Sequence, residues 1–371
     1  MLHISSPALG PEELSAAAEA LSSPWLGLGA VTRAFEEELA EYLGAAHVVA
    51  VNSGTAALHL ALAAHGIGAG DEVVVPSITF AASVQAILAV GATPVFADAL
   101  DETGLLDPDD VVQRLTPRTR AIMPVHLGGS PCDHDRLSAI AESSGAVLIE
   151  DAAHAFGSEW RGRRIGATGT VCFSFDPIKT ITCGEGGAVA VADAAVAEGI
   201  RRWRGLGFDG ATGAASMRTT TFREVTGPGL RAHLPNFCAA IGRAQLRKVD
   251  AFIARRRVIA RRYDAAFGSL RNARIRPVDY DTVVPHIYML RVPGGRRDAA
   301  ADALEAGGVG TGLHYVANHV QPYFRQFVRG PLPVADRLWR ELLTIPLHAA
   351  LTDDDVARVV EAVQVWDASV D

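Results

Sequence analysis

The segment FSFDPIKTITCGEGG, residues 173–187, runs from a strand-like apolar stretch through Lys179 into a glycine-rich turn. Lysine is scarce in this chain: of its 34 Lys and Arg residues, only Lys179 and Lys248 are lysines. Arginine cannot form a Schiff base and keeps its proton in proteins, so a retained lysine is a candidate for covalent chemistry. We predict that Lys179 is a nucleophile rather than an ordinary loop lysine. Lys248, in the arginine-rich stretch AQLRKVD, is predicted to be a surface residue.

Around this segment, from about residue 46 to 191, short β-rich runs alternate with helix-like segments such as TAALHLALAAHG and FAASVQAILAVG. These helix-like segments end at glycine, as helices commonly do. The alternation predicts an α/β fold with βαβ units, in which a mostly parallel sheet has helices on both faces. The seven candidate strands are HVVAV (47–51), EVVVP (72–76), TPVFAD (93–98), RAIMPVHL (120–127), AVLIED (146–151), VCFSFD (171–176) and GAVAV (187–191).

The remainder of the chain is less regular at first and then helical. The stretch GFDGATGAASMRTTTFREVTGPG, residues 207–229, is rich in Gly, Thr and Ser and is predicted to be a long loop, which is often functional in a compact domain. A long helix is expected from about Asn236 to Phe267. We therefore expect a large domain over residues 1–245 and a smaller C-terminal α+β domain over residues 246–371.

Two further motifs stand at predicted strand ends. In LIEDAAHAFG, residues 148–157, Asp151 could pair with a protonated pyridine nitrogen or could cap a following helix, and this motif alone favours neither. In VNSGTAALHLAL, residues 51–62, the helix start near Thr55 could hold a phosphate or could be a simple capped helix. Ligands collect at the carboxyl ends of strands in such sheets. A phosphate cradle, an acid and an amine at successive strand ends are together the requirements of pyridoxal 5′-phosphate (PLP).

Composition argues against several other classes of protein. The net charge of −8 and the pI near 5.8 give no reason to expect nucleic acid or an acidic membrane as a partner. The run of arginines around residues 255–262 is predicted to be the solvated face of a helix. No Cys or His spacing indicates a metal site, no apolar stretch could span a bilayer, and the first residues, MLHISSPALGPEEL, do not have the pattern of a signal peptide, so a cytoplasmic enzyme is expected. The motifs of P-loop and nicotinamide-binding enzymes are absent from the sequence.

The order of motifs along nearly the whole chain resembles the DegT/DnrJ/EryC1/StrS family of sugar aminotransferases. The resemblance rests on SGTAAL, PSITFAASVQAILAVGATPVFAD, PVHLGGSPCDHDRL, EDAAHA, FSFDPIKTITCGEGG, NFCAAIGRAQL and GLHYVANH. It implies a type I aspartate-aminotransferase-like fold and a homodimer with shared active sites. It also implies ping-pong transfer of an amino group, expected to come from L-glutamate, to the keto group of a nucleotide-linked deoxysugar in aminosugar biosynthesis. A dTDP-4-keto-6-deoxyhexose is the first expectation for the acceptor.

The resemblance also implies roles for single residues, with PLP as cofactor and pyridoxamine 5′-phosphate as its aminated form. Lys179 matches the lysine that binds the cofactor and moves the proton, and Asp151 matches the acid on the ring nitrogen. His154 matches the residue beside the ring 3-oxygen, and Phe80 the stacking aromatic. The phosphate contacts match Gly54, Thr55, Ala56 and Ser174, and the segment near the sugar nucleotide matches His314 and Tyr315.

Two positions depart from the family pattern. The GxNxR pattern, whose Asn reaches the phosphate of the partner subunit, reads GLRAHLPN here, with Arg231 at the Asn position and His233 at the Arg position. Arg231 is taken as a candidate phosphate contact, since arginine can bind phosphate bidentately. Asp176 stands where many members have an aromatic residue or His, and its role is not specified by the sequence.

Three other functions compete with this prediction. Amination of a cyclitol or an aminoshikimate-type ketone would use the same motifs and stays open. A sugar dehydratase of the same fold is disfavoured, because those relatives replace the lysine with His. A non-enzymatic regulator is disfavoured because the chain carries no basic DNA-binding appendage. The sugar, the nucleotide, the ring carbon and the configuration of the new amine are left open.

Overall fold

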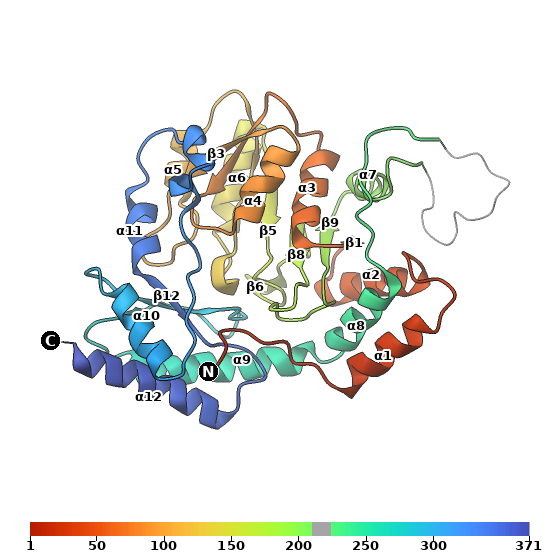
Figure 1. The fold of residues 1–371 in the computed structure, drawn as a ribbon. Coiled ribbons are helices and arrows are strands. Elements are labelled where there is room, and N and C mark those ends of the chain that lie inside the picture. The colour runs from red at the N-terminus through yellow and green to blue at the C-terminus, as the bar shows by residue number, and fades with distance from the viewer. Residues whose placement is uncertain (210–223, 371) are drawn as a thin grey trace.

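The computed structural model describes residues 1–209 and 224–370. In this part of the chain, the seven predicted β-runs form one sheet in the order β1-β9-β8-β5-β4-β2-β3 (Figure 1). The pairings of β9 with β1 and β8 are antiparallel and the others are parallel, which confirms the mostly parallel sheet. The strands are β1 (His47–Val51), β2 (Glu72–Pro76), β3 (Thr93–Ala97), β4 (Thr119–Ile122), β5 (Val147–Asp151), β8 (Thr170–Ser174) and β9 (Gly187–Val191).

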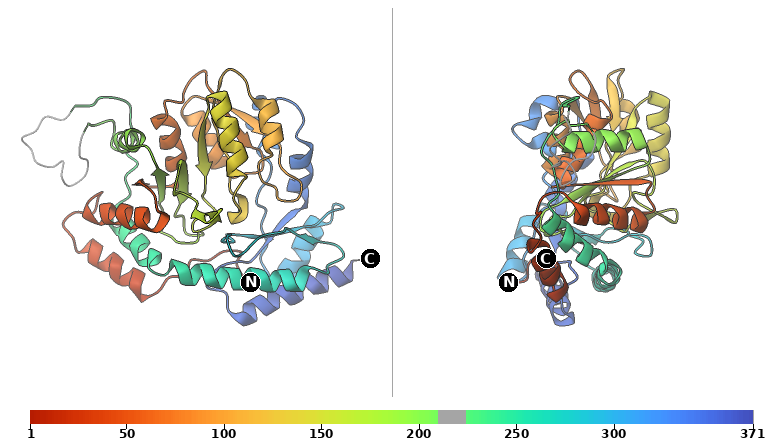
Figure 2. Two further views of the ribbon diagram at one scale, coloured as in Figure 1. Left: turned by 180° about the vertical axis from the view of Figure 1, so that it is seen from behind. Right: turned by 90° about the vertical axis from the view of Figure 1, so that its right-hand side faces the viewer.

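Helices cover both faces of this sheet. Every residue of the β2 run EVVVP is buried, as expected for a strand that has helices on both sides. Helices α3 and α4 lie on one face and α6 lies on the other, as the front and back views show (Figures 1 and 2). The helices around the sheet are α3 (Gly54–Ala64), α4 (Ala81–Ala89), α5 (Pro108–Arg114), α6 (His134–Ser144) and α7 (Ala194–Arg204).

The prediction of one long helix from Asn236 to Phe267 was wrong. The chain forms α8 (Asn236–Leu246) and α9 (Val249–Phe267), with a break at the intervening residues. At this junction Lys248 Nζ pairs with Glu13 at 2.5 Å, and the buried side chain of Gln245 donates to the same carboxylate at 2.8 Å. The break therefore coincides with contacts to α1 (Pro11–Leu21), which packs on α8 beside α2 (Ala30–Leu43). Such contacts are invisible to a periodicity argument.

A second, antiparallel sheet has its own cluster of buried side chains. Its strands are β10 (Arg274–Ile275), β11 (Tyr288–Arg291) and β12 (Leu342–Ile345), and the adjoining helices are α9, α10 (Arg297–Ala306) and α12 (Asp353–Ser369). Leu2 pairs with Val309, so the first residues lie beside this smaller sheet rather than the large one. The division into domains 1–245 and 246–371 stays a prediction. Most of the predicted loop 207–229 lies outside the described residues.

A crossing segment, residues 312–341, leads from the smaller layer over the edge of the large sheet and back. It contains two 3₁₀ turns (Asn318–Val320 and Phe324–Phe327) and α11 (Pro333–Glu341). A third 3₁₀ turn (Leu127–Gly129) and the hairpin of β6 (Glu159–Trp160) with β7 (Arg163–Arg164) complete the elements of residues 1–209 and 224–370. None of the helices in the described ranges is long and apolar enough to cross a membrane.

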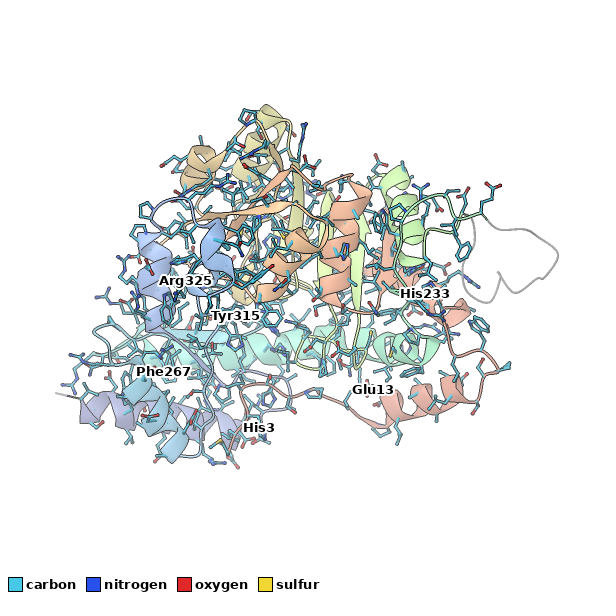
Figure 3. The ribbon with its side chains drawn as sticks, turned by 45° about the horizontal axis from the view of Figure 1, so that its top comes forward. His3, Glu13, His233, Phe267, Tyr315 and Arg325 are labelled. Atoms are coloured by element: carbon cyan, nitrogen blue, oxygen red, sulfur yellow. The ribbon has the colours of Figure 1, made fainter. Side chains whose placement is uncertain are left out.

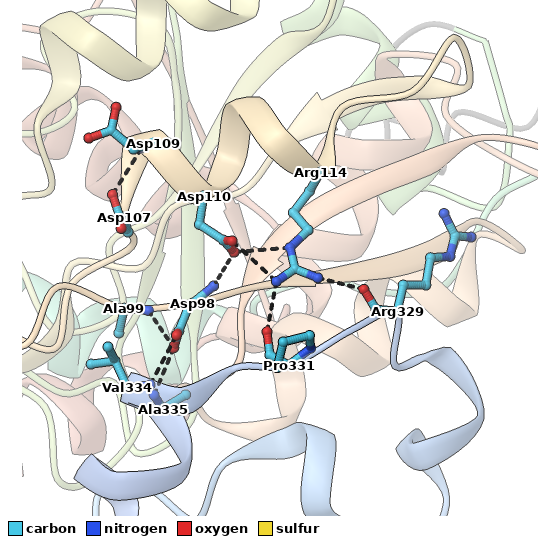
Figure 4. Close-up of polar contacts among 10 residues, drawn as sticks. All are labelled: Asp98, Ala99, Asp107, Asp109, Asp110, Arg114, Arg329, Pro331, Val334 and Ala335. Atoms are coloured by element: carbon cyan, nitrogen blue, oxygen red, sulfur yellow. Dashed lines mark hydrogen bonds and ion pairs between the residues drawn. The ribbon is translucent and has the colours of Figure 1, made fainter.

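The start of α11 is fixed to the large sheet by a polar clamp (Figure 4). The carboxylate of Asp98, just after β3, accepts the backbone N–H groups of Val334 and Ala335 at 3.0 and 2.7 Å. Arg114 donates to the carbonyl of Pro331 at 2.9 Å and is itself held by Asp110. A carboxylate at a helix N-terminus satisfies N–H groups that have no partner within the helix. The clamp therefore fixes the crossing segment to the large sheet.

Candidate active site

A cavity of about 250 Å³ lies at the carboxyl ends of the parallel strands. Nine of the predicted site residues line it: Gly54, Thr55, Phe80, Asp151, His154, Ser174, Lys179, His314 and Tyr315. Ala56 and Arg231 do not. Ala56 lies in the first turn of α3, where its N–H donates to Ser53 Oγ at 3.1 Å. Arg231 is exposed, on a stretch whose backbone pairs with Gly205.

Lys179 extends from the turn after β8 into this cavity. Burial lowers the pKa of its amine, whereas the nearby carboxylates of Asp176 and Asp151 oppose that shift. A larger fraction of neutral amine makes a lysine a better nucleophile and base. Asp176 also lines the cavity, and its carboxylate accepts the N–H of Ile178 at 3.0 Å.

Asp151 ends strand β5 with its carboxylate buried in the cavity wall. Ser83 Oγ donates to Asp151 Oδ2 at 2.7 Å, and the N–H of Ala153 donates to Oδ1 at 3.1 Å. Burial raises the pKa of Asp151, whereas these two hydrogen bonds and the charge of Lys179 oppose the rise. Turns and the β6 strand, rather than a helix, follow Asp151, so the helix-cap interpretation was wrong. Sequence reasoning missed Ser83, whose only signal is its place one turn after Phe80 in the motif TFAAS.

The hydrogen bonds of His154 determine its tautomer. The N–H of Gly128 donates to Nδ1 at 3.3 Å, so the neutral ring carries its proton on Nε2, which lies 3.0 Å from the hydroxyl of Tyr315. Burial lowers the pKa of His154 well below its usual value, which keeps the ring neutral. The ring of His286, which sequence reasoning also missed, lies 4.3 Å from that of His154. His154 therefore acts as a hydrogen-bond donor toward Tyr315 rather than as a cation.

Tyr315 and His314 bring the crossing segment into the site. The ring of Tyr315 lies 5.7 Å from that of Phe80, so the two aromatic side chains form one wall of the cavity. His314 Nδ1 lies 2.9 Å from Thr344 Oγ1, and burial lowers its pKa to about 4. Figure 3 shows Tyr315 near the centre of the molecule and His233 well apart from it, on the side that carries α7. His233, which stands at the Arg position of the GxNxR pattern, is thus remote from Tyr315 within one chain.

The start of α3 forms a cradle against strand β8. Ser53 caps the helix, and a Cβ built on Gly54 would lie 2.8 Å from the Cβ of Ser174, so only glycine allows this approach. Exposed N–H groups at a helix start attract phosphate. Among residues 1–209 and 224–370, no group of three or more His, Cys, Asp and Glu side chains could hold a metal ion. A buried carboxylate, a buried amine and the start of helix α3 around one cavity fit PLP.

The model of the DegT/DnrJ/EryC1/StrS aminotransferase family matches residues 7–364, and the chain belongs to this family. It is similar to DesV from S. venezuelae, solved with a ketimine intermediate, at 38% identity over 97% of this chain and 95% of that one, with a TM-score of 0.90. It is also similar to the sugar aminotransferase CalS13 from Micromonospora echinospora, at 31% identity over 98% and 100% of the chains, with a TM-score of 0.91.

A third similar structure is Spr1654 from Streptococcus pneumoniae, solved in PMP and PLP forms. The PMP form is 27% identical over 99% of each chain, with a TM-score of 0.92. The family match and these neighbours confirm the predicted fold class, and the protein is a PLP-dependent sugar aminotransferase.

Proposed function

We propose that this enzyme transfers an amino group from L-glutamate to the keto group of a nucleotide-linked deoxysugar, with dTDP-4-keto-6-deoxyhexose as the first candidate. The observation that carries the proposal is the meeting of the Lys179 amine, the Asp151 carboxylate and the α3 cradle in one cavity. Family membership supports the sugar as acceptor. The two half-reactions use the same cavity in turn, which is a ping-pong mechanism.

The residues of the cavity divide the work of holding the cofactor. Gly54, Thr55 and Ser174 would hold the phosphate, and Asp151 would face the ring nitrogen. Phe80 would cover the ring, whereas His154 would lie beside the 3-oxygen. When bound, PLP supplies an electron sink that stabilises negative charge on the carbon that loses a proton.

Lys179 is the group that moves protons. Its Nζ, once free, accepts the proton that leaves the α-carbon of the amino donor. In the second half-reaction the same atom delivers a proton to the sugar carbon that takes the amine. The lowered pKa of this amine favours the neutral form needed for the first of these steps.

The cavity of one chain is short of positive charge for anionic ligands. Its charged lining residues are Lys179 and the acids Asp151, Asp176 and Glu185, and burial keeps its histidines neutral. The phosphate, the carboxylates of glutamate and the diphosphate of the sugar nucleotide all need cations. We infer that a second copy of the chain provides Arg231, and that it covers exposed apolar side chains of the first. These are Phe80, Leu206 and Leu230, which are 60%, 41% and 40% exposed.

Subunit mixing tests whether Arg231 acts across the dimer. Arg231→Ala alone is expected to weaken PLP binding about tenfold, as loss of a charge-assisted contact should. In a mixture of Arg231→Ala and Lys179→Ala subunits, half of the dimers pair the two variants, and each such dimer has one intact site. Measured at a PLP concentration near the wild-type dissociation constant, where Arg231→Ala sites are largely empty, activity should then return to roughly a quarter of the wild-type value. If Arg231 acts within its own chain, the mixture gains nothing over the separate variants.

Gly54→Ala is expected to weaken PLP binding by about tenfold, because the new Cβ would press on Ser174 and narrow the cradle. Titration of the apoenzyme with PLP, followed by absorbance, measures the change. Gly68→Ala is the matched control, since its new Cβ meets the carbonyl of Val90 at an ordinary 3.6 Å. Unchanged PLP affinity in Gly54→Ala would show that the phosphate lies elsewhere.

Single-turnover spectroscopy tests the two substrates separately. L-Glutamate should bleach the visible absorption of the PLP enzyme, and this bleaching reports the donor. The aminated enzyme is then mixed with keto sugars linked to dTDP, UDP or GDP, or with a keto cyclitol. Return of the visible band with a nucleotide sugar supports the proposal, and NMR of the product assigns the carbon and its configuration. Return with the keto cyclitol alone would replace the proposed acceptor by the cyclitol alternative.

A further inference from the structure

Two hydroxyl groups, Thr79 on the loop between β2 and α4 and Ser83 in the first turn of α4, lie next to the carboxylate of Asp151. Ser83 Oγ lies 2.7 Å from Asp151 Oδ2, and Thr79 Oγ1 lies 2.9 Å from Ser83 Oγ. Both hydroxyl residues are buried. An ionised carboxylate has no proton to give, so Ser83 donates to Asp151. Because its proton is then used, Ser83 accepts from Thr79, and both O–H bonds point toward the carboxylate.

The outer end of this pair is anchored by the crossing segment. Asn318 Nδ2 donates to the backbone carbonyls of Ser77 and Thr79, at 3.1 and 2.7 Å. The N–H of Asn318 also donates to the carbonyl of Ser77 at 2.8 Å. The backbone around Thr79 is therefore held in place by a residue 239 positions away along the chain. This arrangement gives the hydroxyl pair a fixed position relative to β5.

Other ionisable groups also act on Asp151. The positive charge of Lys179 favours its ionised form. Cys172 and Tyr315 lie near it, and burial raises the pKa of both, so they are neutral. Burial of the carboxylate is the largest influence and opposes ionisation. A local hydrogen-bond donor is thus needed to offset the loss of water.

We propose that Ser83, supported by Thr79, is a positioning residue that keeps Asp151 ionised and directed at the ring nitrogen of PLP. The inference rests on the proposed role of Asp151. A hydrogen bond to the charged form of an acid lowers its pKa, so loss of the bond moves ionisation to higher pH. Since Asp151 must be charged to bind the protonated ring, PLP binding should then fail at a higher pH than in the wild type.

The test is the dissociation constant of PLP for the apoenzyme, measured as a function of pH. The acid limb is the low-pH range in which PLP binding weakens as Asp151 takes up a proton. In Ser83→Ala this limb should move to higher pH by about one unit, so that PLP binds about tenfold more weakly at a pH within the limb. Thr79→Val keeps the shape of the side chain and should move the limb in the same direction by less. Ser158→Ala is the matched control, because Ser158 is equally buried and hydrogen-bonds only backbone, to Gly129 and Val284 in the described contacts. Its acid limb should stay in place whatever its thermal stability.

The outcomes separate the hydroxyl pair from the carboxylate. Acid limbs at the wild-type pH in both Ser83→Ala and Thr79→Val overturn the inference. If Ser83→Ala does not fold, Thr79→Val decides, since it retains Ser83. Asp151→Asn should abolish the acid limb. If Asp151→Asn keeps the acid limb of the wild type, Asp151 does not have its proposed role. If Asp151→Asn loses the limb while Ser83→Ala and Thr79→Val keep it at the wild-type pH, only the role of the hydroxyl pair is removed.

Discussion

Lys179→Ala is expected to lower turnover at least about 10⁴-fold, because one change removes both the covalent anchor of PLP and the proton carrier. The visible band of the lysine-bound cofactor should be absent from this variant, and L-glutamate should produce no bleaching. Absorption spectra before and after glutamate, with circular dichroism to verify folding, measure both effects. Retention of full activity would remove Lys179 from the reaction and reopen the assignments around it.

The chain offers a matched control for this substitution in its only other lysine. Lys248 lies at the junction of α8 and α9, where Nζ pairs with Glu13 at 2.5 Å and Glu12 at 3.3 Å. Neither of these two glutamates lines the cavity. Lys248→Ala should therefore keep the visible band and the response to glutamate, with at most a modest loss of stability.

Glu150→Gln is expected to lower the free energy of unfolding by about 3–5 kcal/mol, the usual cost of breaking a buried ion pair. Glu150 precedes Asp151 on β5 and is 2% exposed. Its Oε2 lies 3.1 Å from both His126 Nε2 and His134 Nδ1. His126 is fully buried and its Nδ1 accepts the N–H of Cys132, so the amide would leave the Nε2–H of His126 and the positive charge of His134 without a carboxylate partner. Urea unfolding measures the change, and Glu142→Gln, at an exposed position on α6, is the control with little expected effect.

The same pair predicts how this difference depends on pH. The hydrogen bond and the charge of Glu150 raise the pKa of His134 above its usual 6.5 against the effect of burial, so its stabilisation is present below pH 6.5 and is lost as the pH rises above the raised pKa. The two histidines lower the pKa of Glu150 from 4.5 to about 2 against the effect of burial, so its stabilisation is present above pH 4.5 and is lost toward pH 2. The stability gap between wild type and Glu150→Gln should be widest between about pH 4.5 and 6.5. A gap that does not change with pH would contradict this assignment of charge.

Local patterns in the sequence predicted the large sheet and the residues at its strand ends. The β2 run EVVVP is buried on both faces, so its apolar character alone marks it as a strand. Lys179 and Asp151 could be found because each lies at the end of such a run or in the turn after it. The pairing of Ser83 with Asp151 and of Tyr315 with His154 could not be predicted, because the paired residues are 68 and 161 positions apart along the chain. The break in the predicted long helix likewise depends on α1, which is distant in sequence.

The polar clamp at Asp98 helps to hold the crossing segment in one conformation before any ligand binds. The crossing segment is held at one end by pairing of Gly312 with Thr344, in its middle by Asn318, and at its far end by Asp98. A loop that becomes ordered only on binding loses conformational entropy, and that loss is subtracted from ligand affinity. Because the wall formed by Tyr315 is already in place, little conformational entropy is lost there when a sugar binds. More of the interaction energy is then available to distinguish one sugar from another.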